Sequence, residues 1–299
     1  MQKKGLGNEG FAILKTKNIP IAIGTKFQFI VCFLLTTFDL RLMTYDYTDT
    51  HTHLYDERLM KDESQIQRAI DAGVTKMYMP NCDSGTIDGM LQLADKWPQN
   101  CMPMMGLHPC YVKENYKDEL ATVADWLQKR KFYAVGEIGL DYYWDMTFKA
   151  QQAEAFETQI DWALQYDLPI VIHSRQSTQD CIDIVRKKQN GVLKGIFHCF
   201  SGTLEEAEQV IGLGLYLGIG GVVTYKNGGL DLIVKEIPLK HIVLETDAPY
   251  LAPVPYRGKQ KNESSFIPVI AAKIAEIKGC SIEEVATIST ANAGNIFPF

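Results

Sequence analysis

The chain has 299 residues, of which 46% are hydrophobic and 22% charged, and its net charge is −6. This composition is typical of a folded globular protein and excludes a disordered or low-complexity chain. The acidic balance also argues against a protein that binds duplex DNA mainly through a broad basic surface. A site that handles a polyanion therefore needs a local source of positive charge, and a metal ion could provide it.

The seven cysteines are scattered along the chain and form no C-x-x-C pair. An odd, scattered set argues against a disulfide framework and against a zinc ribbon. It favours free thiols in a reducing compartment, so we expect a cytoplasmic protein.

Residues 1–42 differ from the rest of the chain. Residues 27–38 form a mostly apolar run of twelve residues, whereas a membrane-spanning helix needs about 20. The run matches a signal-peptide core in length, but the region before it is too long and no small-x-small cleavage site follows. We favour the interpretation that these residues are a dispensable extension, which arises when an upstream translation start is chosen in place of Met43. The alternatives are a signal, an anchor or an ordered appendage. One domain is then expected over residues 43–299, close to the roughly 250 residues of a barrel.

Strand and helix signals alternate from residue 45 onward. The predicted strands are residues 45–49, 74–79, 102–107, 132–135, 168–172, 195–197, 215–219 and 242–244. The predicted helices are residues 63–72, 86–97, 118–130, 148–166, 178–188, 203–211, 230–235 and 266–278, and a last helix beginning at Ser281. Strand–helix alternation indicates a parallel sheet covered on both faces, and eight repeats favour an α/β fold closed into a (β/α)₈ TIM barrel. No G-x-G-x-x-G follows the first strand, so a dinucleotide fold has no specific support.

Two of these helices carry a recognisable start signal. Thr203 is followed three residues later by Glu206, and Ser281 by Glu284. Both pairs match the capping box, in which side chains satisfy free backbone N–H groups at the helix start.

Five of the six histidines fall at or just past the carboxyl end of a predicted strand: His51, His53, His108, His173 and His198. These strand ends form the catalytic face of a (β/α)₈ barrel. Glu137 follows the fourth predicted strand and Asp247 the eighth. The sixth histidine, His241, lies at the amino end of the eighth strand, and we interpret it as structural.

The spacing of these residues predicts a metal site. His51 and His53 are two residues apart at a strand exit, so both imidazoles face the same side and can bind one ion. The further ligands expected are His173, His198, Glu137 and Asp247. Imidazole and carboxylate ligands suit Zn²⁺, Mn²⁺, Fe²⁺ or Co²⁺, and the acids tolerate Mg²⁺. Six ligands are too many for one open tetrahedral site but suit two ions that share a bridging group, so we expect two divalent ions (Mg²⁺, Mn²⁺ or Zn²⁺).

Each residue taken alone has a structural explanation. A strand-end histidine can simply cap backbone, Glu137 can be a buried acid paired with an arginine, and Asp247 can begin a helix. The glycines on either side of Glu137 indicate backbone close to a ligand.

Six segments together resemble one family: Asp49-Thr50-His51-Thr52-His53-Leu54, Gly106-Leu107-His108-Pro109, Gly136-Glu137-Ile138-Gly139-Leu140-Asp141-Tyr142, His173-Ser174-Arg175, His198-Cys199-Phe200-Ser201-Gly202 and Glu245-Thr246-Asp247-Ala248-Pro249-Tyr250-Leu251. They occur in the order found in the TatD family of metal-dependent deoxyribonucleases, over about residues 43–297. The resemblance implies an amidohydrolase-like barrel with a two-metal centre that hydrolyses phosphodiester bonds. By that implication one ion is held by His51, His53, Glu137 and Asp247 and the other by Glu137, His173 and His198, with Glu137 bridging.

The implied chemistry assigns roles to further residues. Two ions lower the pKa of a shared water, and Asp247 can take its proton as general base. A phosphate clamp is expected from His108, Arg257 and Lys259, because arginine binds two phosphate oxygens at once. Arg175 either braces the metal site or contacts substrate. From the clamp arginine onward the family commonly reads Arg-Gly-Lys-x-Asn-Glu-Pro, whereas residues 257–264 of this chain have one extra residue and no proline.

Three functions are compatible with these residues. The first is a nuclease, expected to remove nucleotides in the 3′ to 5′ direction from single-stranded DNA ends, with no membrane and no obligate protein partner. The second is a small-molecule amidohydrolase, lactonase or phosphoesterase on the same barrel. Many such relatives bridge their metals with a carboxylated lysine on the fourth strand, and the presence of Glu137 there favours the nuclease. The third is a catalytically dead binding protein, which the complete ligand set disfavours.

Overall fold

The structure of the chain is a computed structural model that describes residues 45–62 and 64–297. The predictions made for residues 1–42 lie outside this range. Within it, no helix combines the length and the apolar character that crossing a membrane requires. The six cysteines in the described residues are all free thiols, as expected from their spacing.

Eight parallel strands form the centre of the fold. They are β1 (Tyr47–Asp49), β2 (Val74–Pro80), β3 (Cys101–Met104), β4 (Val135–Asp141), β5 (Ile170–Arg175), β6 (Gly195–Phe197), β7 (Tyr216–Ile219) and β8 (Ile242–Leu244). Strands β1 to β3 pair in sequence order, and so do β4 to β8.

Backbone contacts close these two sheets into one barrel. A parallel bridge between Met105 and Val135 joins the end of β3 to β4. On the other side, Thr52 bridges Ala248, and the Thr50 N–H donates to the Leu244 carbonyl at 3.0 Å, which joins β1 to β8. The predicted (β/α)₈ barrel is therefore confirmed.

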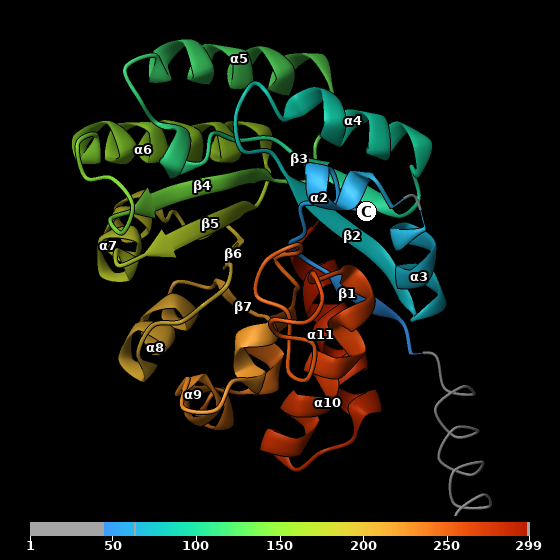
Figure 1. Cartoon of the computed structure of the whole chain (residues 1–299). Helices are drawn as coiled ribbons and strands as arrows, with labels where there is room; N and C mark the ends of the chain where they lie inside the picture. The colour runs from blue at the N-terminus through green and yellow to red at the C-terminus, as the bar shows by residue number, and fades with distance from the viewer. Residues whose placement is uncertain (1–44, 63, 298–299) are drawn as a thin grey trace, which may run out of the picture. The chain divides into compact units, whose positions relative to one another are not determined.

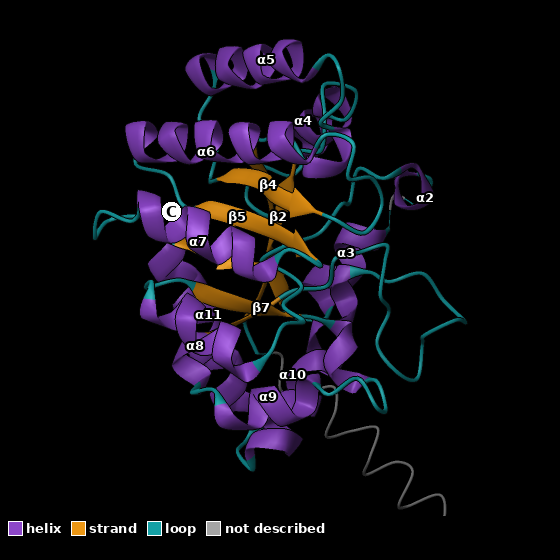
Figure 2. Ribbon diagram, turned by 90° about the vertical axis from the view of Figure 1, so that its left-hand side faces the viewer, coloured by secondary structure: helices purple, strands orange, loops and turns teal. Residues whose placement is uncertain are grey.

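Helices surround the strands on the outside (Figures 1 and 2). They are α2 (Glu57–Met60), α3 (Gln65–Asp71), α4 (Ile87–Lys96), α5 (Tyr116–Lys129), α6 (Lys149–Tyr166), α7 (Thr178–Lys188), α8 (Leu204–Gly212), α9 (Leu230–Glu236), α10 (Ile267–Lys278) and α11 (Ile282–Ile296). Short 3₁₀ turns lie between them at Pro109–Tyr111, Gly221–Thr224, Leu239–His241 and Ser264–Phe266.

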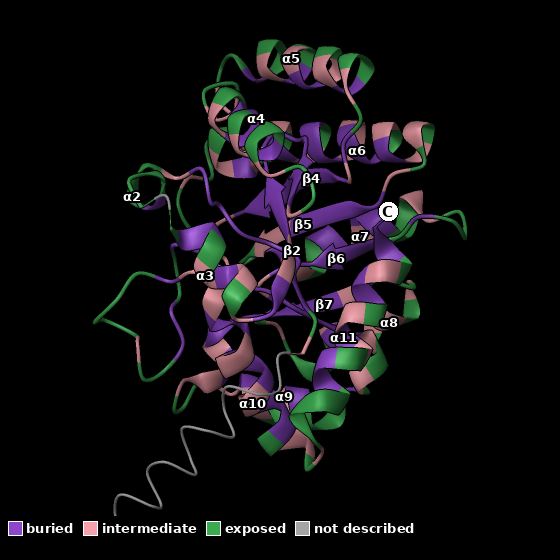
Figure 3. Cartoon of the chain, turned by 90° about the vertical axis from the view of Figure 1, so that its right-hand side faces the viewer, coloured by how far each residue is buried: buried purple, intermediate pink, exposed green. Residues whose placement is uncertain are grey.

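The side chains of the strands divide between two hydrophobic clusters. Alternate residues of a strand point to opposite faces, and accordingly Ile170 and Ile172 join the large cluster while Val171 joins the small one. The small cluster fills the barrel interior, where Tyr78 stacks on Phe297 at 3.8 Å between ring centroids. The large cluster lies between the strands and the helices, whose outer faces are exposed (Figure 3).

Two strands lie further along the chain than their sequences predicted. Residues 132–135 and 168–172 were expected as the fourth and fifth strands, but β4 runs to Asp141 and β5 to Arg175. Glu137 and His173 therefore lie within strands and not after them. We predicted the ends of both strands from the ends of their apolar runs. The pairing between the two strands continues further, through polar residues, because Gly139 to Asp141 pair with His173 to Arg175.

The start of α8 forms the predicted capping box. The Thr203 hydroxyl accepts from the Glu206 N–H at 3.2 Å, and the Glu206 carboxylate accepts from the Thr203 N–H at 2.6 Å. At α11 the Ser281 hydroxyl accepts from the Glu284 N–H at 3.0 Å, which is one half of the same motif.

We expect Thr203→Ala to lower the free energy of unfolding by about 1 kcal/mol, because the first turn of α8 loses its cap. The shift in the midpoint of urea unfolding measures this loss. Thr122→Ala is the matched control, since the Thr122 hydroxyl bonds only to the Asp118 carbonyl within α5 and alanine is the better helix former. Equal midpoints for the two variants would contradict the assignment.

Candidate metal centre

Five imidazoles converge on the buried carboxylate of Glu137 at the carboxyl ends of the strands. The nitrogen-to-oxygen distances to Glu137 are 3.2 Å for His51 Nε2, 3.6 Å for His53 Nε2, 3.2 Å for His108 Nε2, 2.9 Å for His173 Nδ1 and 2.9 Å for His198 Nε2. The residue is 1% exposed. The structure thus brings together segments far apart in the sequence, as the strand-end positions predicted.

Asp247 adds a second carboxylate beside the first pair of histidines. Its Oδ1 lies 3.5 Å from His53 Nε2 and 3.9 Å from His51 Nε2. The Asp247 N–H donates to the His51 carbonyl at 2.9 Å. All six residues predicted as metal ligands therefore meet at one centre.

Asp49 fixes the loops that carry these groups. Its buried carboxylate accepts from the N–H of His51 at 3.3 Å, and from the N–H and hydroxyl of Thr246 at 3.0 and 2.6 Å. Burial raises the pKa of Asp49 to about 7, against the opposing effect of these hydrogen bonds. The carboxylate ties the end of β1 to the end of β8, which positions His51 and Asp247 relative to each other.

A β-bulge positions Glu137. The pairing of β4 with β5 shifts register between Gly136 and Ile138, and such a shift re-aims a side chain without ending the strand. The neighbouring glycines have a packing role, and the expectation that they bring backbone close to a ligand stays a prediction. A Cβ on Gly136 would lie 2.7 Å from the Val171 side chain, and one on Gly139 only 2.1 Å from the His173 carbonyl oxygen.

Hydrogen bonds assign the tautomers of two histidines. The Tyr55 hydroxyl donates to the Pro80 carbonyl, so its oxygen accepts from His53 Nδ1–H at 2.9 Å. His173 Nε2–H donates to Asp141 Oδ2 at 2.8 Å. These bonds leave Nε2 of His53 and Nδ1 of His173 as the nitrogens that face Glu137, and a metal ion that displaced a proton there would find a lone pair on each ring. A lone pair in that direction is what a metal ligand needs.

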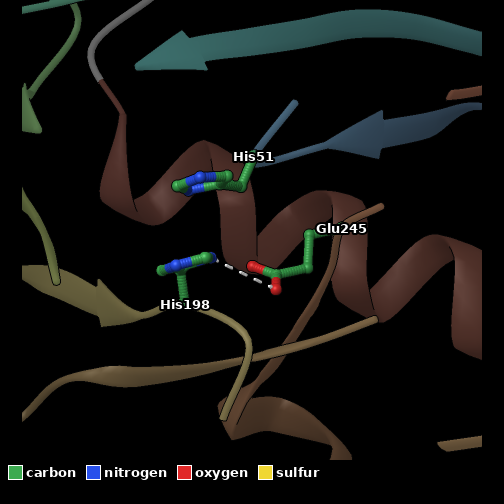
Figure 4. A group of neighbouring side chains, drawn as sticks. All are labelled: His51, His198 and Glu245. Carbon is green, nitrogen blue, oxygen red and sulfur yellow. Dashed lines mark ion pairs between the residues drawn. The ribbon is translucent and has the colours of Figure 1, made fainter. Parts of the chain in front are cut away.

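Glu245 faces the outer nitrogen of His198, at a distance longer than a hydrogen bond. One Glu245 oxygen lies 3.6 Å from His198 Nδ1 and accepts from the Cys199 N–H at 2.5 Å. His198 also stacks on His51 with 3.7 Å between ring centroids (Figure 4). Carboxylates that face the outer nitrogen of a ligating histidine fix its ring and raise its basicity.

His108 has the opposite tautomer. Its Nδ1 accepts from the Cys110 N–H at 3.0 Å, so the proton of the neutral ring sits on Nε2. That N–H points to Glu137 Oε1 at 3.2 Å. His108 is thus a hydrogen-bond donor at the centre, which fits the role predicted for it in substrate binding and not that of a ligand.

The charges of the cluster balance around Glu137. Burial alone would raise the pKa of Glu137, but the imidazoles of His108, His198 and His51 lower it well below its usual value. Burial opposes protonation of His198, whereas Glu137 and Glu245 raise its pKa well above the usual value. A carboxylate that is ionised and buried needs positive charge nearby. Divalent cations can provide it.

The donor set fits divalent metal ions. Four groups of side chains each place their ligand atoms within 4.8 Å of one another, and Glu137 and His51 each belong to two of them. Nitrogen and carboxylate oxygen donors suit Zn²⁺ and Mn²⁺, and the carboxylates also suit Mg²⁺.

Sequence reasoning missed Glu245 and Asp141 as residues that orient histidines. The alternation of side chains along a strand, in which every second residue points to the same face, would have found both. Val243 points into the barrel, so Glu245, two residues later, falls on the same face, and Asp141 lies four residues after Glu137.

The remaining predicted residues lie around or outside the cavity at this centre. Its volume is about 880 Å³, and its lining includes His108 and Arg175. Arg257 and Lys259 are not among the described residues that line this cavity. Arg257 is exposed, and its guanidinium packs over the Tyr225 ring at 3.8 Å from the ring centroid. The phosphate-clamp role of these two residues stays a prediction. His241 lies beside the amino end of β8.

The fold and the site define a metal-dependent hydrolase built on a (β/α)₈ barrel. The family model described as TatD related DNase matches residues 48–298. The chain belongs to the TatD family.

Relatives and solved structures agree with this assignment. The chain is 37% identical to YabD of Bacillus subtilis, an uncharacterized metal-dependent hydrolase, over 83% of this chain and 98% of that protein. It is 32% identical to the 3′-5′ ssDNA/RNA exonuclease TatD of Pantoea vagans, over 78% of this chain and 91% of that protein. The crystal structure of YjjV, a TatD homolog from Escherichia coli, superposes with a TM-score of 0.79 at 29% identity, covering 85% of this chain and 99% of that chain.

We expect Glu137→Gln to bind metal at least about 100-fold more weakly, because it removes the central charge, and even outer-shell changes cost 10- to 100-fold. Elemental analysis after dialysis against buffered Mn²⁺ or Zn²⁺ measures the ions held per chain. Glu276→Gln is the control, since Glu276 is an exposed partner of Lys273 on α10. Equal metal content in the Glu137 variant and the wild-type protein would contradict the assignment.

Proposed function

We propose that this protein is a two-metal phosphodiesterase that removes nucleotides in the 3′ to 5′ direction from single-stranded DNA. The observation that carries the proposal is the set of nitrogen and carboxylate donors around Glu137, at a cavity of about 880 Å³. The name of the Pantoea relative supports nucleic acid as the substrate class.

Two overlapping ligand sets are available in this arrangement. His51, His53, Glu137 and Asp247 would hold one divalent ion, and Glu137, His173 and His198 the other, with Glu137 shared. Ions bound there would lower the pKa of a water towards neutrality and offset the charge of the phosphate. The outer hydrogen bonds of His53 and His173 support these assignments because they leave Nε2 of His53 and Nδ1 of His173 facing inward.

Asp247 is suited to act as general base. Burial would raise its pKa, but His53, His198 and His51 lower it, so the group stays ionised at neutral pH. Its side chain is 15% exposed, which leaves it access to water in the cavity. It can therefore accept the proton of the attacking water.

His108 and Arg175 supply contacts to the phosphate. His108 Nε2–H points into the centre and can donate to a non-bridging oxygen. Arg175 lines the same cavity and presents a guanidinium that suits a phosphate. The positive charge is thus local to the barrel mouth, in agreement with the net charge of −6.

We assign this activity to a domain of residues 43–299 that works in the cytoplasm. The family match over residues 48–298 supports the extent of the domain. The free thiols of the described cysteines support a reducing compartment.

The test is a single-stranded oligonucleotide labelled at its 5′ end and incubated with Mg²⁺ or Mn²⁺. We expect a ladder of progressively shorter labelled products, which EDTA abolishes, and a rate about 10² to 10⁴ lower for Asp247→Asn because the general base is lost. His241→Ala, which changes a histidine at the other end of the barrel, should retain the wild-type rate.

Two results would reject the proposal. Failure to shorten the oligonucleotide with any divalent ion would reject nuclease activity. Rapid turnover of nitrophenyl esters or lactones by the same preparation would then identify a small-molecule hydrolase.

A further inference from the structure

Aromatic and cationic side chains gather on one side of the cavity. Tyr143 and Trp144 follow β4 and are 49% and 68% exposed. The Arg175 guanidinium, at the end of β5, lies 3.8 Å from the Tyr143 ring centroid and 5.2 Å from that of Trp144. Trp144 and Arg175 line the same cavity as Glu137 and His173. We refer to Tyr143, Trp144 and Arg175 as the aromatic rim.

Asp141 couples the aromatic rim to the metal centre. Its Oδ2 accepts from His173 Nε2–H at 2.8 Å, while its Oδ1 accepts from the N–H groups of Tyr143 at 2.9 Å and Trp144 at 3.1 Å. The carbonyl of Arg175 accepts from the Tyr142 N–H at 2.9 Å. These bonds fix the backbone of the rim relative to His173, so its rings are presented at a set place beside the reacting phosphate.

A third aromatic residue, Tyr250, lies near the carboxyl end of β8. Tyr250 follows β8, lines the same cavity and is 45% exposed, with the Arg58 guanidinium 4.4 Å from its ring centroid. Strands β4 and β8 are four apart in a closed barrel of eight. Exposed rings paired with cations therefore flank the metal centre on opposite sides.

We infer that the aromatic rim is a base-stacking subsite, which holds the unpaired base next to the phosphate cleaved at the metal centre. The inference rests on the proposed function and specifies its substrate as an unpaired strand with bases. Exposed rings bind single strands because every base has a π-face, and arginine adds charge and stacking. In a duplex the bases are stacked on one another and paired, so the rim favours single strands.

Trp144 itself reports on the subsite. All four tryptophans of the chain lie in the described residues, and Trp144 is the one whose side chain is exposed. A base stacked on its indole should quench the intrinsic fluorescence. The Asp247→Asn background slows shortening of the oligonucleotide during the titration. We expect saturable quenching by single-stranded oligonucleotides and much less by a blunt duplex of the same sequence.

Substitution measures the contribution of the ring. Trp144→Ala should bind a 5′-labelled single strand about 5- to 100-fold more weakly, by fluorescence anisotropy, because stacking of one base is lost. Trp144→Phe keeps a ring and should restore most of the affinity. Leu232→Ala is the control, since Leu232 is 67% exposed on α9 and does not line the cavity. Metal content and thermal midpoint, measured for each variant, report on the fold and the centre.

A strand with abasic sites at its 3′ end separates base contacts from phosphate contacts. It retains the phosphates, so the difference between Trp144→Ala and the parent protein should disappear on this strand. A difference that persists on the abasic strand, or equal affinities on the normal strand, would overturn the inference while leaving nuclease activity intact. If the wild-type protein neither binds nor shortens any single strand, the proposed function fails, and the subsite fails with it.

Discussion

The site depends on one buried carboxylate that faces five imidazoles. Glu137 is 1% exposed, and an isolated ionised carboxylate at such depth would be strongly unfavourable. The surrounding nitrogens compensate for the lost hydration and lower the pKa of Glu137. The barrel makes the arrangement possible because its strands direct side chains from distant parts of the chain into one mouth. The bulge in β4 then turns Glu137 towards the others.

Outer carboxylates organise the histidines around this centre. Asp141 accepts from His173, and Glu245 faces His198 from the side away from Glu137. The Tyr55 hydroxyl does the same for His53. A different set of hydrogen bonds places the proton of His108 inward. Similar imidazoles are therefore suited to two chemical roles, candidate metal ligand and hydrogen-bond donor, according to the group that each contacts on its outer side.

The sequence was sufficient to predict the barrel and the six clustered side chains, because strand alternation and strand-end polar residues are local patterns. It was insufficient where the decisive contacts are tertiary. The ends of β4 and β5 were placed too early, since pairing between the strands, and not apolarity, extends them to Asp141 and Arg175. Glu245 was missed although it lies two residues after Val243, which points into the barrel. The position of Arg257 over Tyr225 depends on a loop fold that residue types do not specify.

The seam between β1 and β8 has a consequence for how the enzyme matures. His51 and His53 come from the first strand and Asp247 from the last, and the Asp49 carboxylate joins the two through Thr246. An ion site built from these three residues is therefore incomplete until β8 docks beside β1. Full coordination of an ion there would follow closure of the barrel.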